Sequence, residues 1–272
     1  MTLEKQIFKD FTLYIVDNNS PDDSWIIANE LAKTVDFKCV LIHEKNNWGI
    51  AKGNNIGIQA ALNDGCEYIL LANNDITIND DAIDNLYKSL VATNATLAVP
   101  KIYYYGTNII WQAGGNFNKL KATTHHRGNL EEDNGQYDRV ECVGYSSTCF
   151  MLIHKDVFGM VGLMDELYFV YYDDSDFIYR CTQQNCEKLV YVPSSVVYHK
   201  VSTSTQKGSD FYNRMMFRNR MLFVRKNFAS LRKIITIANL FLYHYSVHPF
   251  VMDHNEFKVT SKAMIEGLNM KK

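Results

Sequence analysis

Short apolar runs that each end in a polar turn, with helical segments between them, most restrict the fold of this 272-residue chain. Residues 11–16, 40–43 and 68–72 are rich in β-branched and aromatic side chains, which is typical of buried strands. Residues 25–33 and 51–63 instead have apolar side chains at helical spacing. Strands that alternate with helices over short links predict an α/β fold, with a mostly parallel sheet covered by helices.

The middle of the chain continues this pattern less regularly. We expect a helix over residues 80–92 and strands over 97–104 and 145–154. Between the two strands, residues 106–139 are expected to form a long loop or irregular hairpin, and residues 155–159 a short helical turn. Two further extended pieces, 189–192 and 196–199, are separated by Pro193, which cannot donate to a strand ladder.

The composition changes beyond residue 205. Residues 210–228 form a basic segment with helical spacing, residues 231–247 are apolar, and the final residues look weakly structured. We therefore expect one domain over 1–205 and a C-terminal helical extension over 206–272. The basic segment either presents Arg and Lys to a lipid-linked acceptor or anionic membrane, or is an ordinary solvated helix face.

Three carboxylates lie close together in an aromatic and aliphatic frame, between Tyr168 and Arg180. They are Asp173, Asp174 and Asp176. Burying a charged carboxylate is costly without a compensating partner, so this pattern indicates a metal site, a proton-transfer site or a structural ion pair. Arg180 is the available partner for an ion pair, and acids at a helix start are also favoured by the helix dipole.

Polar side chains follow two of the expected strands. Asp17 closes the first strand and either binds the polar edge of a ligand or caps the next turn. Asp75, in Asn73-Asn74-Asp75, offers a carboxylate oxygen suited to Mg²⁺ or Mn²⁺, although such a sequence is more often a turn. Because ligands bind at the carboxyl ends of strands in such sheets, both acids are expected at one edge.

Other candidate groups are weaker. Asn47 and Gly49 begin a turn into a helix that can approach phosphates, but the glycines fit neither the Rossmann nor the P-loop pattern. His199 ends an extended run, where a histidine more often has a structural role than a ligand-binding one. His125 and His126 lie in the expected loop at 106–139 and are expected to be solvated. The six cysteines have no zinc-site spacing.

Charge and composition exclude some classes of protein. The formal net charge of −2 gives no general attraction to nucleic acid. Scattered cysteines, a start without the features of a signal peptide and the lack of a long apolar run predict a cytoplasmic chain, soluble or peripheral at the inner face of the membrane.

Six motifs in a fixed order resemble the inverting glycosyltransferases of family 2, most closely their rhamnosyltransferase-like and galactofuranosyltransferase-like bacterial branch. The motifs are Val16-Asp-Asn-Asn-Ser20, Asn47-x-Gly-x-Ala-x-Gly-x-Asn55, Leu70-Leu-Ala-Asn-Asn-Asp75, Met164-Asp-Glu-x-Tyr-Phe169, Tyr172-Asp-Asp-Ser-Asp-Phe-x-x-Arg180 and Tyr198-His199. The resemblance covers roughly residues 5–205. It implies a GT-A fold, in which a mixed sheet is flanked by helices.

The resemblance also implies roles for particular residues. Asp174 would be the general base, with Asp173 as its competitor or as a metal neighbour, and Asp176 is left as the partner of Arg180. Residues 73–75 stand where the family has its D-x-D motif, with Asn73 in place of the first aspartate, and Asp75 and His199 would hold the divalent cation. Asp165 and Glu166 would line the acceptor or sugar site. The nucleotide sugar would contact Asp17, Asn19, Asn47, Gly49, Lys52, Asn55, Asn73 and Asn74.

The implied reaction fits these residue types. A carboxylate takes the proton of an acceptor hydroxyl, and Mn²⁺ or Mg²⁺ neutralises the departing diphosphate. The implied partners are a UDP- or dTDP-sugar donor and a glycan or lipid-linked acceptor in cell-surface polysaccharide synthesis, without nucleic acid.

One departure from the family leaves other hypotheses open. The chain starts where the first helix of the family ends, so a central strand beside Tyr14 is expected to be missing from the sheet. A non-catalytic relative that binds nucleotide sugar, glycan or a partner enzyme is the alternative. A nucleotidyltransferase is a less favoured alternative, because the glycine and lysine pattern typical of the first turn in such enzymes is absent from this sequence.

Overall fold

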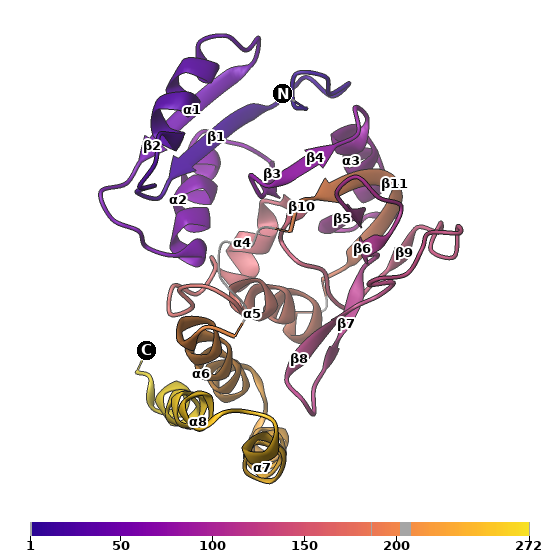
Figure 1. Cartoon of the computed structure of the whole chain (residues 1–272). Coiled ribbons are helices and arrows are strands. Elements are labelled where there is room, and N and C mark those ends of the chain that lie inside the picture. Colours follow the sequence, from indigo (N-terminus) through magenta and orange to yellow (C-terminus); the bar gives the residue numbers. More distant parts are fainter. Residues whose placement is uncertain (1, 186, 202–207, 272) are drawn as a thin grey trace.

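The computed structural model describes residues 2–185, 187–201 and 208–271. Strands and helices alternate along the first two thirds of the chain, and three long helices follow at one end of the molecule (Figure 1). The predicted α/β class, with a mixed sheet flanked by helices and C-terminal helices, is confirmed.

A small parallel sheet and two helices come first. Their bounds are β1 (Thr12–Asp17), α1 (Ser24–Ala32), β2 (Lys38–His43) and α2 (Ile50–Asn63). The register pairs Thr12 with Lys38 and Asp17 with His43, so both strands end at the same edge. Helix α2 buries Ile58 and Ala61 in the main hydrophobic core.

A larger sheet occupies the centre of the molecule, with the strand order β3-β10-β5-β11-β4. Strand β6 pairs with β5, and β9 pairs with β11. The bounds are β3 (Tyr68–Ala72), β4 (Ile76–Ile78), β5 (Leu97–Tyr104), β6 (Ile110–Gln112), β9 (Glu141–Cys142), β10 (Phe150–His154) and β11 (Leu189–His199). Among the strand pairs that the structure describes in this larger sheet, β5 with β11 is the one parallel pair, so the prediction of a mostly parallel sheet is wrong here.

The two sheets are separate. Within the described ranges β1 pairs with β2 alone, and β3 ends the larger sheet with β10 as its partner. The predicted interruption of the sheet beside Tyr14, which lies in β1, is therefore present. Helix α2 and its packing against Ile69 and Leu71 of β3 join the two parts.

Two segments are more ordered than the sequence indicates. The expected loop at 106–139 contains β6 and the hairpin of β7 (Gly115–Asn118) and β8 (Thr123–His126). The two pieces around Pro193 form one strand, β11, whose register shifts between Val192 and Val196. The shift lets proline sit in a strand without breaking the ladder on either side.

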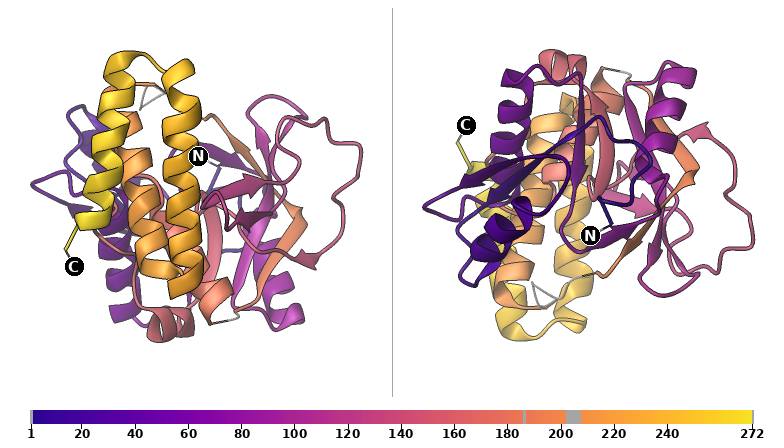
Figure 2. Two further views of the ribbon diagram at one scale, coloured as in Figure 1. Left: turned by 90° about the horizontal axis from the view of Figure 1, so that it is seen from below. Right: turned by 90° about the horizontal axis from the view of Figure 1, so that it is seen from above.

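The remaining helices cover the sheet and one end of the molecule. Their bounds are α3 (Ala82–Thr93), α4 (Asp156–Val161), α5 (Asp173–Tyr179), α6 (Asp210–Asn227), α7 (Ser230–Val247) and α8 (His254–Asn269), with a π-helical turn at Arg180–Gln184 after α5. Figure 2 shows α6, α7 and α8 side by side from below. The expectation of weak structure near the C-terminus is wrong, since α8 starts with a capping box of Asp253 and Glu256.

Helix α6 is packed into the body of the molecule. Met221, Leu222 and Phe223 share a hydrophobic cluster with Tyr172 and Tyr179, on either side of the carboxylates of α5. Its basic side chains contact protein groups: Glu266 for Arg214, the Leu167 carbonyl for Arg218, the Lys121 carbonyl for Arg220, the Leu268 carbonyl for Arg225 and Asp165 for Lys226. The idea that this helix presents its cations to a membrane is therefore not supported.

No helix within the described ranges is long and apolar enough to cross a bilayer.

Candidate active site

The turn before α5 is held in an unusual backbone conformation. Tyr171 and Tyr172 have φ angles of 64° and 66°, a left-handed region that side chains with a Cβ rarely occupy. Asn219 of α6 is fully buried, and its Nδ2 donates to the carbonyls of Val170 (2.8 Å) and Tyr171 (2.9 Å). Strain of this kind persists where surrounding structure fixes it, commonly at functional sites.

Asp174 follows this turn and is fixed by three hydrogen bonds. Its Oδ2 accepts from the Tyr145 hydroxyl at 2.7 Å, and its Oδ1 accepts from the backbone N (2.5 Å) and Oγ (3.1 Å) of Ser175. These donors define the orientation of the carboxylate. The side chain is only partly buried, so a substrate hydroxyl can still approach it.

Asp173 has a different environment. It is 4% exposed, and burial, followed by the neighbouring charge of Asp174, raises the pKa of its carboxyl above the usual value. A buried carboxyl of this kind favours the neutral form.

Asp176 is the structural member of the three acids. Its Oδ2 accepts from Arg180 Nε at 2.9 Å, and its Oδ1 accepts from the Tyr168 hydroxyl (3.2 Å) and Asn227 Nδ2 (2.7 Å). The prediction that Asp176 pairs with Arg180 is confirmed.

Asp75 and His199 meet at the edge of the larger sheet. Antiparallel pairing places His199, at the end of β11, opposite Ile76 of β4, and Asp75 directly precedes Ile76. The distance from His199 Nε2 to Asp75 Oδ1 is 3.1 Å. His199 is 8% exposed, and its Nδ1 has no hydrogen-bond partner among the residues that the structure describes. The structure thus brings together the two side chains that the family resemblance implies as metal ligands.

A row of ring contacts connects this pair with Asp174. The Trp111 ring lies 4.6 Å from the His199 ring and 4.7 Å from the His126 ring. The His126 ring lies 5.9 Å from the ring of Tyr145, whose hydroxyl donates to Asp174. Burial lowers the pKa of His126, while the charge of Asp174 acts in the opposite direction. The expectation of a solvated His126 is therefore wrong, although His125 is exposed.

Asp17, at the end of β1, is buried and contacts nearby residues of the same small sheet and turn. Its Oδ2 lies 2.9 Å from His43 Nδ1, and its Oδ1 accepts from Ser20 N at 3.3 Å. The interaction with Ser20 is the capping role considered from the sequence. Asn19 lies in the same turn, with a φ angle of 61° and an exposed side chain.

The Asn47–Gly49 turn is tied to the β1 loop by Asn18, which sequence reasoning missed. Asn18 Nδ2 donates to Asn47 Oδ1 (3.3 Å) and to the Gly49 carbonyl (2.9 Å), while Trp48 N donates to Asn18 Oδ1 (3.1 Å). Gly49 has a φ angle of 83°, and a Cβ there would lie 2.2 Å from the Phe169 carbonyl oxygen. Glycine is required because this turn touches the loop that leads to α5.

Asn55 and Lys52 on α2 contact the loop of residues 163–167. Asn55 Nδ2 donates to the Met164 carbonyl (2.9 Å) and Glu166 Oε1 (3.1 Å), and Met164 N donates to Asn55 Oδ1 (3.0 Å). Lys52 Nζ lies 3.9 Å from Glu166 Oε2 and 4.0 Å from the centre of the Trp48 ring. Asn55 thus fixes a loop, in addition to any contact with a donor.

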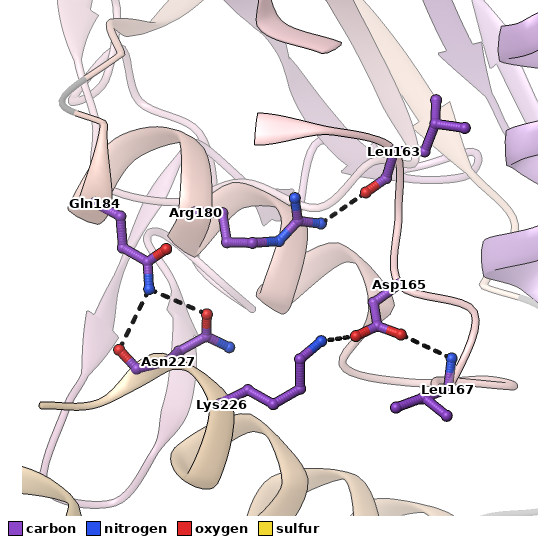
Figure 3. A pocket seen from close by; sticks show the side chains of 7 residues that line it. All are labelled: Leu163, Asp165, Leu167, Arg180, Gln184, Lys226 and Asn227. Atoms are coloured by element: carbon purple, nitrogen blue, oxygen red, sulfur yellow. Dashed lines mark hydrogen bonds and ion pairs between the residues drawn. The ribbon is translucent and has the colours of Figure 1, made fainter. Parts of the chain in front are cut away.

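Asp165 and Glu166 have different surroundings. Asp165 forms an ion pair with Lys226 and accepts from Leu167 N at 2.9 Å, whereas Glu166 contacts α2. A surface pocket of about 530 Å³ lies beside Asp165, between its loop and α6 (Figure 3). It is lined by Leu163, Asp165, Leu167, Arg180, Gln184, Lys226 and Asn227.

Asn73 and Asn74 directly follow β3 and are exposed, and Asn73 N donates to the Cys149 carbonyl at 2.9 Å. Within the described part of the chain, no group of three or more His, Cys, Asp or Glu side chains could hold a metal ion by itself. The pair Asp75 and His199 nevertheless offers an oxygen and a nitrogen donor suited to Mn²⁺.

The family model of glycosyl transferase family 2 matches residues 2–158, which is more than half of the chain. The chain belongs to glycosyl transferase family 2. This family 2 glycosyltransferase is 23% identical over 239 residues to the low-salt glycan biosynthesis hexosyltransferase Agl10 of Haloferax volcanii, covering 81% of this chain and 77% of that protein. It is 29% identical over 232 residues to the dTDP-rhamnosyl transferase RfbF of Shigella flexneri, covering 80% and 72%, respectively.

Solved structures show the same fold for this family 2 glycosyltransferase. The crystal structure of TarS from S. aureus matches with a TM-score of 0.62 at 15% identity, over 98% of this chain and 45% of TarS. The mannosyltransferase PcManGT from Pyrobaculum calidifontis, in complex with GDP-Man and Mn²⁺, matches with a TM-score of 0.54 at 14% identity, over all of this chain and 70% of that protein. The GT-A fold expected from the motifs is confirmed.

Sequence reasoning did not identify Trp111, Tyr145 or Asn219. Trp111 and Tyr145 belong to segments without a distinctive motif, and Asn219 lies in a helix that we regarded as an extension. Their contacts join positions far apart in the sequence, so only the fold shows them.

Proposed function

We propose that this glycosyltransferase is an inverting, metal-dependent enzyme in which Asp174 is the general base. The observation that supports the proposal most is the row of rings that runs from the Asp75–His199 pair to the Tyr145 hydroxyl on Asp174. The row connects the Asp75–His199 pair, which could bind a cation together with a diphosphate, to Asp174, which could accept the proton of an acceptor hydroxyl.

The roles of the acids follow from their environments. Asp174 is partly exposed and is oriented by three hydrogen bonds, so it can take the proton of the acceptor hydroxyl as that oxygen attacks the anomeric carbon. Asp173 is less suited to this role, because burial raises its pKa and keeps it protonated.

Asp75 and His199 would hold the divalent cation, Mn²⁺ or Mg²⁺, together with the diphosphate of the donor. Bound there, the cation supplies charge neutralisation for the leaving diphosphate. The Mn²⁺ complex of PcManGT supports this proposal. The buried Nδ1 of His199, which lacks a described partner, is consistent with a role for the ring beyond packing.

The donor is a nucleotide-diphosphate sugar of the UDP or dTDP type, by analogy with the name of RfbF. Asp17, Asn19, Asn47, Gly49 and Lys52 lie on the β1 loop or on the turn and helix beside it, where they would contact the donor together with Asn55, Asn73 and Asn74. The acceptor is a glycan or a lipid-linked glycan of the cell surface, as the glycan biosynthesis role in the name of Agl10 suggests. Asp165 and Glu166 would lie on the acceptor or sugar side.

The experiment that tests the base compares wild type with Asp174→Asn on a panel of nucleotide sugars with Mn²⁺. Removing the base should lower kcat by about 100-fold or more, while the thermal transition stays within a few degrees. Glu67→Gln, a change to an exposed carboxylate on another face, is the matched control and should act like wild type. Equal rates for Asp174→Asn and wild type would exclude Asp174 as the base.

The separation of the two sheets favours one second candidate, a non-catalytic relative that binds nucleotide sugar, glycan or a partner enzyme. Strand β1 leads into the loop expected to contact the donor, and within the described residues it pairs with β2 alone, so that loop has less support than a continuous sheet gives. Binding of nucleotide sugar by calorimetry, without turnover for any donor in the panel, would favour this candidate.

A further inference from the structure

Helix α7 exposes its apolar side. Its outer face carries side chains spaced three or four residues apart, which places them in one stripe along the helix. Leu231, Ile234 and Leu242 are 73%, 65% and 70% exposed. The full stripe, which we call the α7 surface, consists of Leu231, Ile234, Ile235, Ala238, Leu242 and Tyr245.

The opposite side of α7 is buried against the protein and is mixed. Leu240, Ile237 and Phe241 pack in the hydrophobic cluster around Phe223, and Thr236 and His244 are buried beside them. Thr236 Oγ1 donates to the Lys119 carbonyl at 3.1 Å, and His244 Nε2 lies 2.9 Å from Ser261 Oγ. A helix at a water-exposed protein surface normally has a single apolar stripe that faces inward, whereas α7 has a second one that faces outward. An exposed apolar stripe of this kind indicates a surface that contacts a partner or a membrane.

The β7–β8 turn lies beside the α7 surface. Asn239 Nδ2 of α7 donates to the Leu120 carbonyl at 3.3 Å, and the Leu120 side chain is 52% exposed. Residues 117–123 and 230–247 contain Lys119, Lys121, Arg232 and Lys233 but neither Asp nor Glu. These two segments therefore add positively charged side chains next to the apolar stripe and no negatively charged ones.

We propose that the α7 surface, with Leu120 of the β7–β8 turn, inserts into the headgroup region of an anionic lipid bilayer. Aliphatic and tyrosine side chains with flanking lysine and arginine are the composition of helices that lie in this region. Lipid phosphates complement the cations, whereas a second copy of the same segments would bring only further cations from them. Since no described helix can cross a bilayer, α7 lies along the surface.

The arrangement places the candidate active site close to the lipid. Strands β7 and β8 continue from the turn to His126, in the row of rings next to Asp174. The Tyr172 hydroxyl donates to the Ala122 carbonyl at 2.9 Å, which connects the same turn to the residue before Asp173. A bilayer against α7 therefore presents lipid-attached groups on the side of the molecule where the carboxylates lie.

Vesicle co-sedimentation of the full chain tests the proposal, independently of any sugar transfer. Vesicles of phosphatidylcholine with phosphatidylglycerol should bind wild type, and phosphatidylcholine alone should bind it more weakly. Ile234→Glu/Leu242→Glu should reduce binding by about tenfold or more, because two apolar anchors are replaced by charges. Arg232→Gln/Lys121→Gln, which changes two exposed cations, should reduce binding to the anionic vesicles by about fivefold for each cation removed.

The matched control is Ile26→Glu/Ile27→Glu on α1, which makes the same change at two residues that are 61% and 56% exposed on another element. It should bind vesicles like wild type. All three variants change exposed or half-buried side chains, and circular dichroism verifies that each is folded.

Any of three results would overturn the proposal. The first is that wild type does not bind the anionic vesicles, and the second is that Ile234→Glu/Leu242→Glu binds them as well as wild type does. The third is a wild-type dimer that does not bind vesicles and is dissociated by Ile234→Glu/Leu242→Glu in sedimentation velocity, which would assign the α7 surface to a second copy of the chain.

Discussion

Adjacent aspartates in one helical turn have opposite properties because their side chains point into different surroundings. Asp174 meets the Tyr145 hydroxyl and the Ser175 donors, whereas Asp173 is buried beside the charge of Asp174. Which of the two acts as base could not be derived from the residues Tyr172-Asp173-Asp174 alone, since neighbouring positions differ only in direction. The structure supplies the direction, and with it a reason to prefer Asp174.

Asp173→Asn should stabilise the fold increasingly as the pH rises. The raised pKa means that the folded state favours the protonated carboxyl, so its contribution to stability is fully present below the unfolded pKa and is lost as pH rises through the folded one. Asparagine cannot ionise and avoids this loss, which amounts to about 1.4 kcal/mol for each unit by which the pKa is raised.

Thermal unfolding of wild type and Asp173→Asn between about pH 5 and about pH 8 measures this effect. The difference in Tm in favour of the variant should grow with pH. A constant difference would show that Asp173 ionises as it does in the unfolded chain.

At the Asp75–His199 pair, removal of either side chain should weaken Mn²⁺ binding in the presence of a nucleoside diphosphate. Loss of one of two protein ligands is expected to cost about tenfold to 100-fold in affinity. Calorimetric titration of Mn²⁺ into wild type, Asp75→Ala and His199→Ala checks this, with His125→Ala, an exposed histidine, as control. Unchanged affinity in both variants would mean that other residues bind the metal.

Among the elements, α6 is the one whose role differs most from the expectation. It is a support for the site, because Asn219 holds the left-handed turn at Tyr171 and Tyr172 and Lys226 pairs with Asp165. Its sequence has helical spacing, which correctly predicts a helix, but spacing does not show that an asparagine at its centre bonds to carbonyls 48 and 49 residues away.

Asn219→Ala should reduce both stability and turnover. Two partly buried carbonyls would lose their donor, at a cost of about 2 kcal/mol in the free energy of unfolding. The turn that orients Asp173 and Asp174 would also relax, so kcat should fall more than KM rises.

Urea unfolding and steady-state kinetics measure the two effects, and Asn255→Ala, a change to an exposed asparagine of α8, is the control. If Asn219→Ala keeps the kcat of wild type while losing stability, Asn219 supports the fold without positioning the carboxylates.

Helix α8 shows why some elements were not predicted. It packs closely against α6 through Gly267, where a Cβ would lie 2.1 Å from the Arg218 carbonyl oxygen. Small residues make this contact, so the spacing of large apolar residues gives little indication of it. The capping signal of Asp253 and Glu256 is readable in the sequence and would have indicated where α8 begins.

For the whole molecule, local patterns predicted most strands and helices but not the order of the larger sheet. Residues 68–72 and 97–104 are strands with the predicted bounds. The insertion of β10 between them depends on pairing across the chain, which periodicity does not encode. Likewise the ordered motifs indicated the family, whereas the rings of Trp111, His126 and Tyr145 between two of those motifs had to be seen in the fold.

The residues proposed to bind the donor and the proposed base, Asp174, belong to parts of the molecule that are built on separate sheets. No ladder of hydrogen bonds joins β1 to β3 within the described residues, and the apolar face of α2 against β3 makes much of the connection. Association of apolar surfaces weakens on cooling and under pressure. The strand that ends in Asp17 is therefore expected to be held against the rest of the molecule less firmly at low temperature or high pressure than under ordinary conditions.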